Sequence, residues 1–152
     1  MQKRRDNHCW AMHGGGVEIG ETVEETAKRE LLEETGLIAN DLELLGVFSG
    51  EDRLYTYPNG DEVYTIGIVY VCRDFSGDLL SQTDETTELK WFNIDELPDD
   101  IFPPNKKPLK AFVDYINRTK GYRQHFKCFI RLALADYLSK FSLELKIMVL
   151  SL

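Results

Sequence analysis

The chain has 152 residues, of which 43% are hydrophobic and 29% are charged, and its net charge is −8. This length fits one ordinary domain, and the composition excludes a largely disordered chain. The acidic balance also disfavours nonspecific binding to nucleic acid, because the phosphate backbone carries charge of the same sign.

The charge is unevenly distributed along the chain. Residues 121–152 contain five basic and two acidic side chains, a net +3, which leaves −11 for residues 1–120. We therefore expect acid-dependent chemistry in the first 120 residues. The predicted organisation is one domain over 1–120 and a helical C-terminal extension over 121–152, which is either part of the same unit or a tail.

The three cysteines, Cys9, Cys72 and Cys128, are widely scattered and form no C-x-x-C pair. That spacing argues against a disulfide framework or a zinc site and predicts a reducing, cytoplasmic setting. The N-terminus has no apolar signal-peptide core, and charged residues interrupt the most apolar segment, residues 126–152. We therefore expect no membrane partner.

A helix is predicted between Thr22 and Gly36. Thr22 followed by Glu25 forms a capping box, and an apolar residue recurs at every fourth position from Val23 to Leu31. Gly36 supplies the left-handed stop that commonly ends a helix.

The next segments predict strands. Leu42–Ser49 is one strand, and Leu54–Tyr57 and Val63–Cys72 flank the turn signal Pro58–Asp61, which predicts a hairpin. Both alternating sets of side chains in Val63–Cys72 are largely apolar. This pattern is typical of a strand covered on both faces, and so of a layered α/β fold.

The remainder of the chain predicts one short strand followed by helix. In chain order the predicted segments are a strand at Leu89–Phe92, a turn at Asp95–Pro98, a loop at Phe102–Asn105, a helix at Pro108–Arg118 that ends at Gly121, and further helix over most of residues 122–152.

The acidic end of the first helix carries the chemical signal. In RELLEETGL, Glu30 and Glu34 are four residues apart on one face, and Glu33 flanks them. Several negative charges near a helix C-terminus are unfavourable, because they repel one another and the negative end of the helix dipole, and a bound cation usually compensates them. Mg²⁺ or Mn²⁺ prefers such oxygens and could clamp a pyrophosphate and activate water. The alternative is a solvated acidic face.

The same segment resembles a known family motif. Gly15, five residues, Glu21, seven residues and then RELxEExGL match every defined position of the Nudix box, nine positions over 23 residues. The stretches WAMHGGGVEIGET and ETTELKWFNIDELP are also similar to the family, so the resemblance covers roughly residues 2–116.

The resemblance implies a Nudix-type α/β/α sandwich with a mixed β-sheet and a hydrolase that cleaves the pyrophosphate bond of a nucleoside diphosphate linked to another moiety. Mg²⁺, or Mn²⁺, would be the cofactor. The substrate could be ADP-ribose, a nucleoside triphosphate or a dinucleoside polyphosphate. The alternative is a non-catalytic nucleotide-binding module or an inactive truncated remnant. Homodimers are common in the family, so the apolar C-terminal segment is a candidate interface.

The resemblance also implies roles for individual residues. The catalytic and metal-binding residues would be Glu30, Glu33 and Glu34, with the carbonyl of Gly14 as a further metal ligand. Arg29 would orient these glutamates as part of the catalytic set. Glu85 is the candidate catalytic base, with Glu88 as the second candidate. The candidate substrate contacts are Arg4, Glu18 and Tyr55. The structural positions of the motif are Gly15, Glu21, Leu31, Gly36 and Leu37.

Two features depart from the family pattern. His13 stands where the family usually has proline, which predicts a looser loop rather than a metal ligand, because Mg²⁺ prefers oxygen. Only fourteen residues precede Gly15, so we expect one or two N-terminal strands to be missing and a sheet edge to be uncovered. Extra C-terminal helices are the predicted addition.

Overall fold

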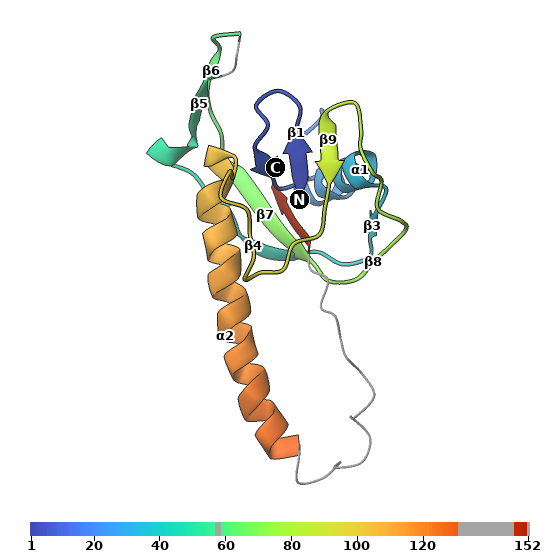
Figure 1. The fold of residues 1–152 in the computed structure, drawn as a ribbon, viewed down its shortest axis with the longest axis vertical. Helices are drawn as coiled ribbons and strands as arrows, with labels where there is room; N and C mark the ends of the chain where they lie inside the picture. Colours follow the sequence, from blue (N-terminus) through green and yellow to red (C-terminus); the bar gives the residue numbers. More distant parts are fainter. Residues whose placement is uncertain (57–58, 131–147, 152) are drawn as a thin grey trace.

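The computed structural model describes residues 1–56, 59–130 and 148–151. Figure 1 shows how the helices and strands of these residues are arranged. In chain order they are β1 (Gln2–Arg4), β2 (Trp10–Ala11), α1 (Val23–Thr35), β3 (Ile38–Ala39), β4 (Glu43–Phe48), a 3₁₀ helix (Glu51–Arg53), β5 (Leu54–Thr56), β6 (Glu62–Tyr64), β7 (Gly67–Cys72), β8 (Phe75–Ser76), β9 (Thr86–Leu89), a second 3₁₀ helix (Pro103–Asn105), α2 (Lys106–Ile130) and β10 (Met148–Ser151).

Helix α1 begins and ends where the sequence predicts. The Thr22 hydroxyl accepts the backbone N–H of Glu25 at 3.2 Å, and the Glu25 carboxylate accepts the backbone N–H of Thr22 at 2.8 Å. Gly36 closes the helix with a φ of 77°, and a Cβ there would lie 2.8 Å from the carbonyl oxygen of Asp78. The capping box and the glycine stop are therefore confirmed.

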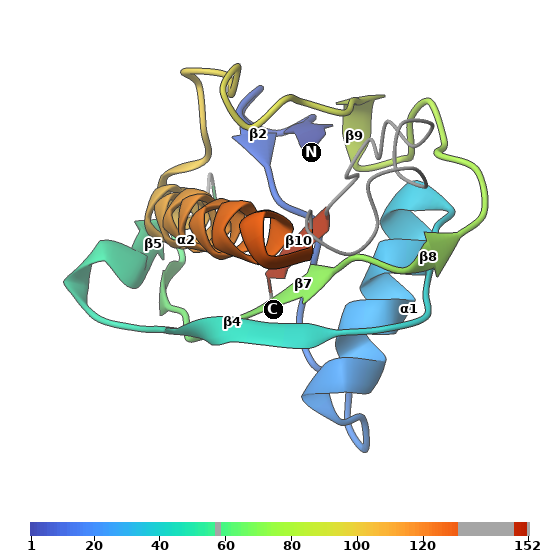
Figure 2. The same ribbon diagram turned by 90° about the horizontal axis from the view of Figure 1, so that it is seen from below.

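Strand β7 is the centre of the layered arrangement. Val69 and Val71 belong to a core cluster with residues of α2, whereas Tyr70 and Cys72 belong to a second cluster with residues of α1. Because successive side chains of a strand point to opposite faces, α1 and α2 cover opposite faces of the sheet β10-β7-β4. Figure 2 shows α2 along this sheet and α1 beyond it. The predicted α/β sandwich is confirmed.

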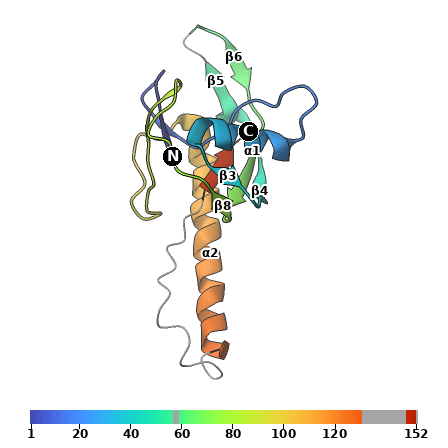
Figure 3. The same cartoon turned by 90° about the vertical axis from the view of Figure 1, so that its right-hand side faces the viewer.

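A second sheet has the order β2-β1-β9, and all of its strand pairs are antiparallel. Gln2 pairs with Ala11 on one side and with Leu89 on the other. An isolated parallel bridge joins Trp10 to Ile101. This sheet fixes the start of the chain near Met12, where the loop into α1 begins, since the Gln2 amide nitrogen lies 3.4 Å from the Met12 carbonyl oxygen. Figure 3 shows the N-terminus and α1 from the side.

The predicted strand Val63–Cys72 is divided in two. Strand β6 pairs with β5, which confirms the hairpin, whereas β7 pairs with β4 and β10. The division falls at Thr65, whose backbone N–H donates to the carbonyl of Arg53 at 3.1 Å. The buried Arg53 side chain lies against Gly67, so the chain changes sheets here. An uninterrupted apolar pattern gives no sign of such a change of partner.

Other boundaries also differ from the prediction. Leu42–Ser49 is confirmed as β4. The strand predicted at Leu89–Phe92 was placed too late in the chain: β9 spans Thr86–Leu89 and stops opposite Gln2, where its antiparallel partner β1 begins. Phe102–Asn105 was predicted as loop, and Pro103–Asn105 forms a 3₁₀ helix. Gly121 does not end α2, which continues to Ile130.

The C-terminal prediction is confirmed only in part. Helix extends to Ile130, but Met148–Ser151 is a strand, and residues 131–147 and 152 lie outside the described residues. Strand β10 pairs with β7 on the side away from β4, so both sides of β7 have a neighbour. The uncovered edge that we expected is therefore not at β7. Within the described residues, no helix is long and apolar enough to cross a membrane.

Candidate active site

Arg29 joins the carboxylates on the exposed side of α1. Its Nε and Nη2 donate to the two oxygens of Glu21 at 2.7 and 3.0 Å. Its Nη1 donates to Glu30 at 2.8 Å and to Glu33 at 3.1 Å, and Nη2 also reaches the carbonyl of Gly16 at 3.1 Å. One guanidinium thus connects the glycine loop to two glutamates of the helix, using the planar fork of donors that arginine provides.

Glu21 connects the glycine loop to the first turn of α1. The hydrogen bonds from Arg29 hold the pKa of Glu21 at about 2, and bonds from the backbone N–H of Glu18 and the hydroxyl of Thr26 contribute. The Thr26 bond measures 2.8 Å and the Glu18 bond 3.1 Å. Glu21 is therefore ionised at neutral pH and braces the loop against the helix.

Glu34 lies on the buried side of the same helix and is only 8% exposed. Its Oε1 accepts the side-chain amide of Gln2 at 2.8 Å, and its Oε2 accepts the backbone N–H of Gly14 at 2.8 Å. The Nδ1 of His13 lies 3.6 Å from Oε2. Burial lowers the pKa of His13, so the imidazole is uncharged at neutral pH. The neighbours of Glu34 named here are therefore neutral.

Glu30 lies between these two sides and against the glycine loop. A Cβ built on Gly15 would lie 2.4 Å from the Oε1 of Glu30, so only glycine allows this close approach. Burial raises the pKa of Glu30, and repulsion from Glu34 and Glu33 adds to it, while the hydrogen bond from Arg29 opposes it. Electrostatic repulsion therefore acts among the carboxylates of Glu30, Glu33 and Glu34.

A cavity of about 460 Å³ opens beside Glu34. It brings together residues from β1, from the glycine loop, from α1 and from the loop before β9. The residues that line it are Gln2, Arg4, Arg5, Asp6, Gly14, Glu34, Asp84 and Glu85. Four of the predicted site residues therefore line one cavity: Glu34 from the Nudix-like motif, Gly14 directly before the motif, and Arg4 and Glu85 from other parts of the sequence.

The other predicted site residues lie outside this lining set. Glu18 is exposed and Tyr55 is half-buried. Tyr55 packs edge-on against Phe102, with ring centroids 4.9 Å apart, and the guanidinium of Arg4 lies 4.7 Å from the same Phe102 ring. Glu88 is exposed and pairs across the sheet with Lys3. Leu31 and Leu37 are buried core residues.

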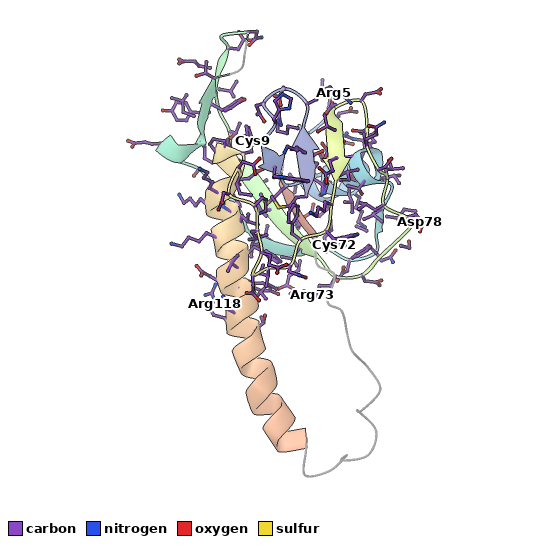
Figure 4. The ribbon with its side chains drawn as sticks, viewed as in Figure 1. Arg5, Cys9, Cys72, Arg73, Asp78 and Arg118 are labelled. Carbon is purple, nitrogen blue, oxygen red and sulfur yellow. The ribbon has the colours of Figure 1, made fainter. Side chains whose placement is uncertain are left out.

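Four residues of the cavity wall were not predicted, namely Gln2, Arg5, Asp6 and Asp84. The Arg5 side chain donates to the carbonyls of Asp84 at 3.0 Å and Thr86 at 3.2 Å, and its backbone N–H donates to the carbonyl of Glu85 at 3.0 Å. Arg5 thus holds the loop that carries Glu85, and Figure 4 shows it near the β1 and β9 end of the molecule, away from Arg73 and Arg118. The sequence feature that could have pointed to Arg5 was its position next to Arg4 in the basic run Lys3–Arg5.

The donor chemistry of this site fits a hard divalent cation. Carboxylate and carbonyl oxygens from Glu30, Glu33, Glu34 and Gly14 are the ligand types that Mg²⁺ and Mn²⁺ prefer. As placed, however, no three His, Cys, Asp or Glu side chains among the described residues could hold a metal ion. In this arrangement Glu30 and Glu33 accept hydrogen bonds from Arg29, and Glu34 accepts them from Gln2 and Gly14. An ion would have to take Glu30 and Glu33 from Arg29.

Curated proteins of known name are similar to this chain in sequence. Over 118 residues the chain is 40% identical to an ADP-ribose pyrophosphatase of Methanocaldococcus jannaschii, a match that covers 76% of this chain and 65% of that protein. Over 92 residues it is 37% identical to the nucleoside triphosphatase NudI of Salmonella typhimurium, covering 58% of this chain and 64% of that protein. The chain thus spans less than two thirds of either relative.

A solved structure agrees with these relatives. The crystal structure of a MutT NUDIX hydrolase from Burkholderia pseudomallei matches with a TM-score of 0.61 at 30% identity, covering 72% of this chain and 84% of that one. A family model described as the NUDIX domain matches residues 1–112, which include the glycine loop, the acidic helix and the loop that carries Glu85. On sequence and on fold, the chain belongs to the Nudix hydrolase family.

Proposed function

We propose that this chain hydrolyses the pyrophosphate bond of a nucleoside diphosphate linked to another moiety, with Mg²⁺ or Mn²⁺ as cofactor. The observation that carries the proposal is the cavity beside Glu34. It joins Glu34 of the motif and Gly14, which directly precedes the motif, to Arg4 and Glu85, for which the family resemblance implied a substrate contact and a catalytic base.

Glu30, Glu33, Glu34 and the carbonyl of Gly14 would hold the metal ion. When bound, the ion supplies Lewis-acid stabilisation of the phosphate charge and lowers the pKa of a water. The chain supplies the rest. Arg29 keeps Glu30 and Glu33 beside the glycine loop through hydrogen bonds of 2.8 and 3.1 Å, and it would release their oxygens when the ion binds.

The residues outside the motif act on the substrate. Arg4 would pair with a phosphate oxygen in exchange for Asp6, which it contacts at 2.7 Å. Glu85 would accept the proton of the attacking water, a role that requires only a carboxylate within hydrogen-bond reach. Arg5 keeps the loop of Glu85 against β1. Attack of that water on phosphorus releases two phosphorylated products.

The substrate is proposed from the relatives, because the cavity does not select among nucleotides. The relatives carry the names ADP-ribose pyrophosphatase and nucleoside triphosphatase. ADP-ribose is the first candidate, since that relative has the higher identity and covers more of this chain. Tyr55 and Phe102 lie next to Arg4, where an aromatic pair could contact a base. Glu18 stays a predicted contact.

Two further expectations stay predictions. Cys9 and Cys72 are free thiols, which agrees with the reducing, cytoplasmic setting that their spacing predicts. The homodimer was predicted from the apolar C-terminal segment, and residues 131–147 of that segment lie outside the described residues. The proposed division at residue 120 falls inside the continuous helix α2.

The experiment is a screen of the purified chain with Mg²⁺ against ADP-ribose, NADH, dinucleoside polyphosphates and nucleoside triphosphates. We expect one of these to be hydrolysed, and Glu34→Gln to lower that turnover at least about a hundredfold, as loss of a charge-stabilising group does. Glu62→Gln changes an exposed carboxylate on β6 and serves as the matched control. Binding without hydrolysis across the panel would instead identify a nucleotide-binding module, and full turnover by Glu34→Gln would remove Glu34 from the site.

A further inference from the structure

Gln2 is a polar side chain in a position where a strand normally buries an apolar one. It is 4% exposed and lies in the middle strand of the sheet β2-β1-β9, opposite Ala11 and Leu89. Buried polar groups are rare unless a hydrogen-bonding partner or a ligand accounts for them. Its environment therefore has to explain it.

The amide nitrogen of Gln2 has two acceptors. Nε2 donates to the Oε1 of Glu34 at 2.8 Å and lies 3.4 Å from the carbonyl oxygen of Met12. Because both neighbours are acceptors, they fix which end of the amide is the nitrogen. The bond to Glu34 joins β1 to α1 across 32 residues of sequence.

The amide oxygen of Gln2 is the unexplained atom. It is buried and has no hydrogen-bond partner among the residues that the structure describes. The same side chain lines the cavity together with Glu34 and Gly14. An acceptor that the protein itself leaves unpaired, in the wall of a cavity, is suited to a donor that arrives with the ligand.

The two ends of the amide therefore have different tasks. The nitrogen occupies one oxygen of Glu34 and, with the Gly14 N–H on the other oxygen, fixes the plane of that carboxylate. Both donors are neutral, so they orient Glu34 without cancelling its charge. A cationic partner such as Arg29 would partly cancel that charge. Ligand carboxylates in metal sites are commonly held by partners of this kind.

We propose that Gln2 is a positioning residue for Glu34 and that its free oxygen accepts a hydrogen bond from a water held in the cavity when a divalent cation is bound. The inference rests on the proposed function, since it assigns Glu34 to the metal. It adds a residue that lies outside the motif and that no sequence pattern identified.

The test is Gln2→Met, which keeps the length of the side chain and removes both polar atoms. Mn²⁺ binding, followed by the EPR signal of the free ion in the absence of nucleotide, should weaken about 10- to 100-fold, the usual effect of losing a partner of a metal ligand. With the best substrate of the panel, kcat should fall by a similar factor while KM changes less than about threefold. Gln82→Met, which alters an exposed glutamine, should leave both values unchanged.

Two further variants keep the test decisive. Gln2→Asn retains a buried amide but shortens it by one methylene, so it should also lose Mn²⁺ affinity, and it replaces Gln2→Met if that variant does not fold. In the Glu34→Gln background, Gln2→Met should cause little further loss, because a positioning residue acts through its partner.

The outcomes separate this inference from the proposed function. A wild-type chain that binds Mn²⁺ but hydrolyses nothing would overturn the proposed function, and the Mn²⁺ effect of Gln2→Met would still support the inference. Folded Gln2 variants with Mn²⁺ affinity within twofold of wild type would overturn the inference that Gln2 positions Glu34. So would an equal loss in the presence and absence of Glu34, or a wild-type chain that binds no Mn²⁺.

Discussion

The two sides of α1 hold their carboxylates by different means. On the exposed side, Arg29 pairs with Glu21, Glu30 and Glu33 through charged hydrogen bonds. On the buried side, Glu34 is held by the amide of Gln2 and the backbone of Gly14, both neutral. The first arrangement is an ion-pair network within the motif, and the second is built from a strand and a loop packed on the helix.

This difference separates two requirements of a cation site. Three carboxylates, those of Glu21, Glu30 and Glu33, share the single guanidinium of Arg29, and Glu34 adds a fourth without a cationic partner of its own among the described residues, which leaves an excess of negative charge for a divalent ion. The exposed side has ligands that can exchange Arg29 for the ion, because charged contacts near the surface are weak and easily replaced. The buried side has a ligand that is already oriented. Glu34 would then define where the ion binds, and Glu30 and Glu33 would close around it.

The greatest loss of activity is expected from Gly15→Ala, which displaces Glu30 from the exposed side of α1. The new Cβ would lie 2.4 to 2.7 Å from the Glu30 carboxylate, which must move away. Because a flexible side chain yields rather than the backbone, we expect the protein to fold while Glu30 leaves its place beside the loop. A displacement of about 1 Å at a reacting site can cost about a hundredfold in kcat, which steady-state kinetics with Mg²⁺ would measure.

Gly16→Ala is the matched control for this loop. A Cβ at Gly16 has nothing within 4 Å, so its turnover should equal that of wild type. If Gly15→Ala and Gly16→Ala behaved alike, the contact between Gly15 and Glu30 would not be what the loop requires.

A smaller effect is expected from Arg29→Lys, which keeps the charge of the exposed side and removes its geometry. A lysine ammonium cannot bind both oxygens of Glu21 and also reach Glu30 and Glu33, as the guanidinium does. We expect kcat to fall about tenfold, with Mn²⁺ affinity altered less than in Gln2→Met, because Glu34 is untouched. Lys28→Arg, an exposed neighbour on α1, is the control. Turnover within twofold of wild type would show that charge alone suffices.

The exposed side could be predicted from sequence because its contacts are local. The capping box at Thr22, the spacing of Glu30, Glu33 and Glu34, and the stop at Gly36 all depend on residues within one helix or its adjoining loop. Helical periodicity fixes such neighbours before the rest of the chain folds. The resemblance to the Nudix box rested on these same residues.

The buried side could not be predicted because its contacts join distant segments. Gln2 meets Glu34 only through the packing of β1 on α1, and nothing in the five residues around Gln2 signals that neighbour. The division at Thr65 and the pairing of β10 with β7 are similar cases, since both depend on which strand supplies the partner. Side-chain alternation indicates that a strand exists but not what lies beside it.

A smaller change than these is expected in the pH dependence of stability, through Glu21 on the exposed side of α1. Arg29 and the other hydrogen bonds depress the folded-state pKa of Glu21 to about 2, from an ordinary value of 4.5. A group whose folded pKa is depressed stabilises the protein fully above its unfolded pKa and loses that contribution as the pH falls through the folded value. The stability difference between wild type and Glu21→Gln should therefore be constant from pH 7 to about 5 and should shrink between about 4.5 and 2.

Urea unfolding in EDTA measures this difference without interference from metal ions. In the Arg29→Gln background the difference should be smaller at neutral pH and should depend less on pH, because Arg29 is the largest cause of the depressed pKa of Glu21. A difference that persists unchanged in that background would mean that Thr26 and the Glu18 backbone, rather than Arg29, brace the loop. The exposed side of α1 would then resemble the buried side, with a carboxylate oriented by neutral donors and Arg29 free to exchange with a cation.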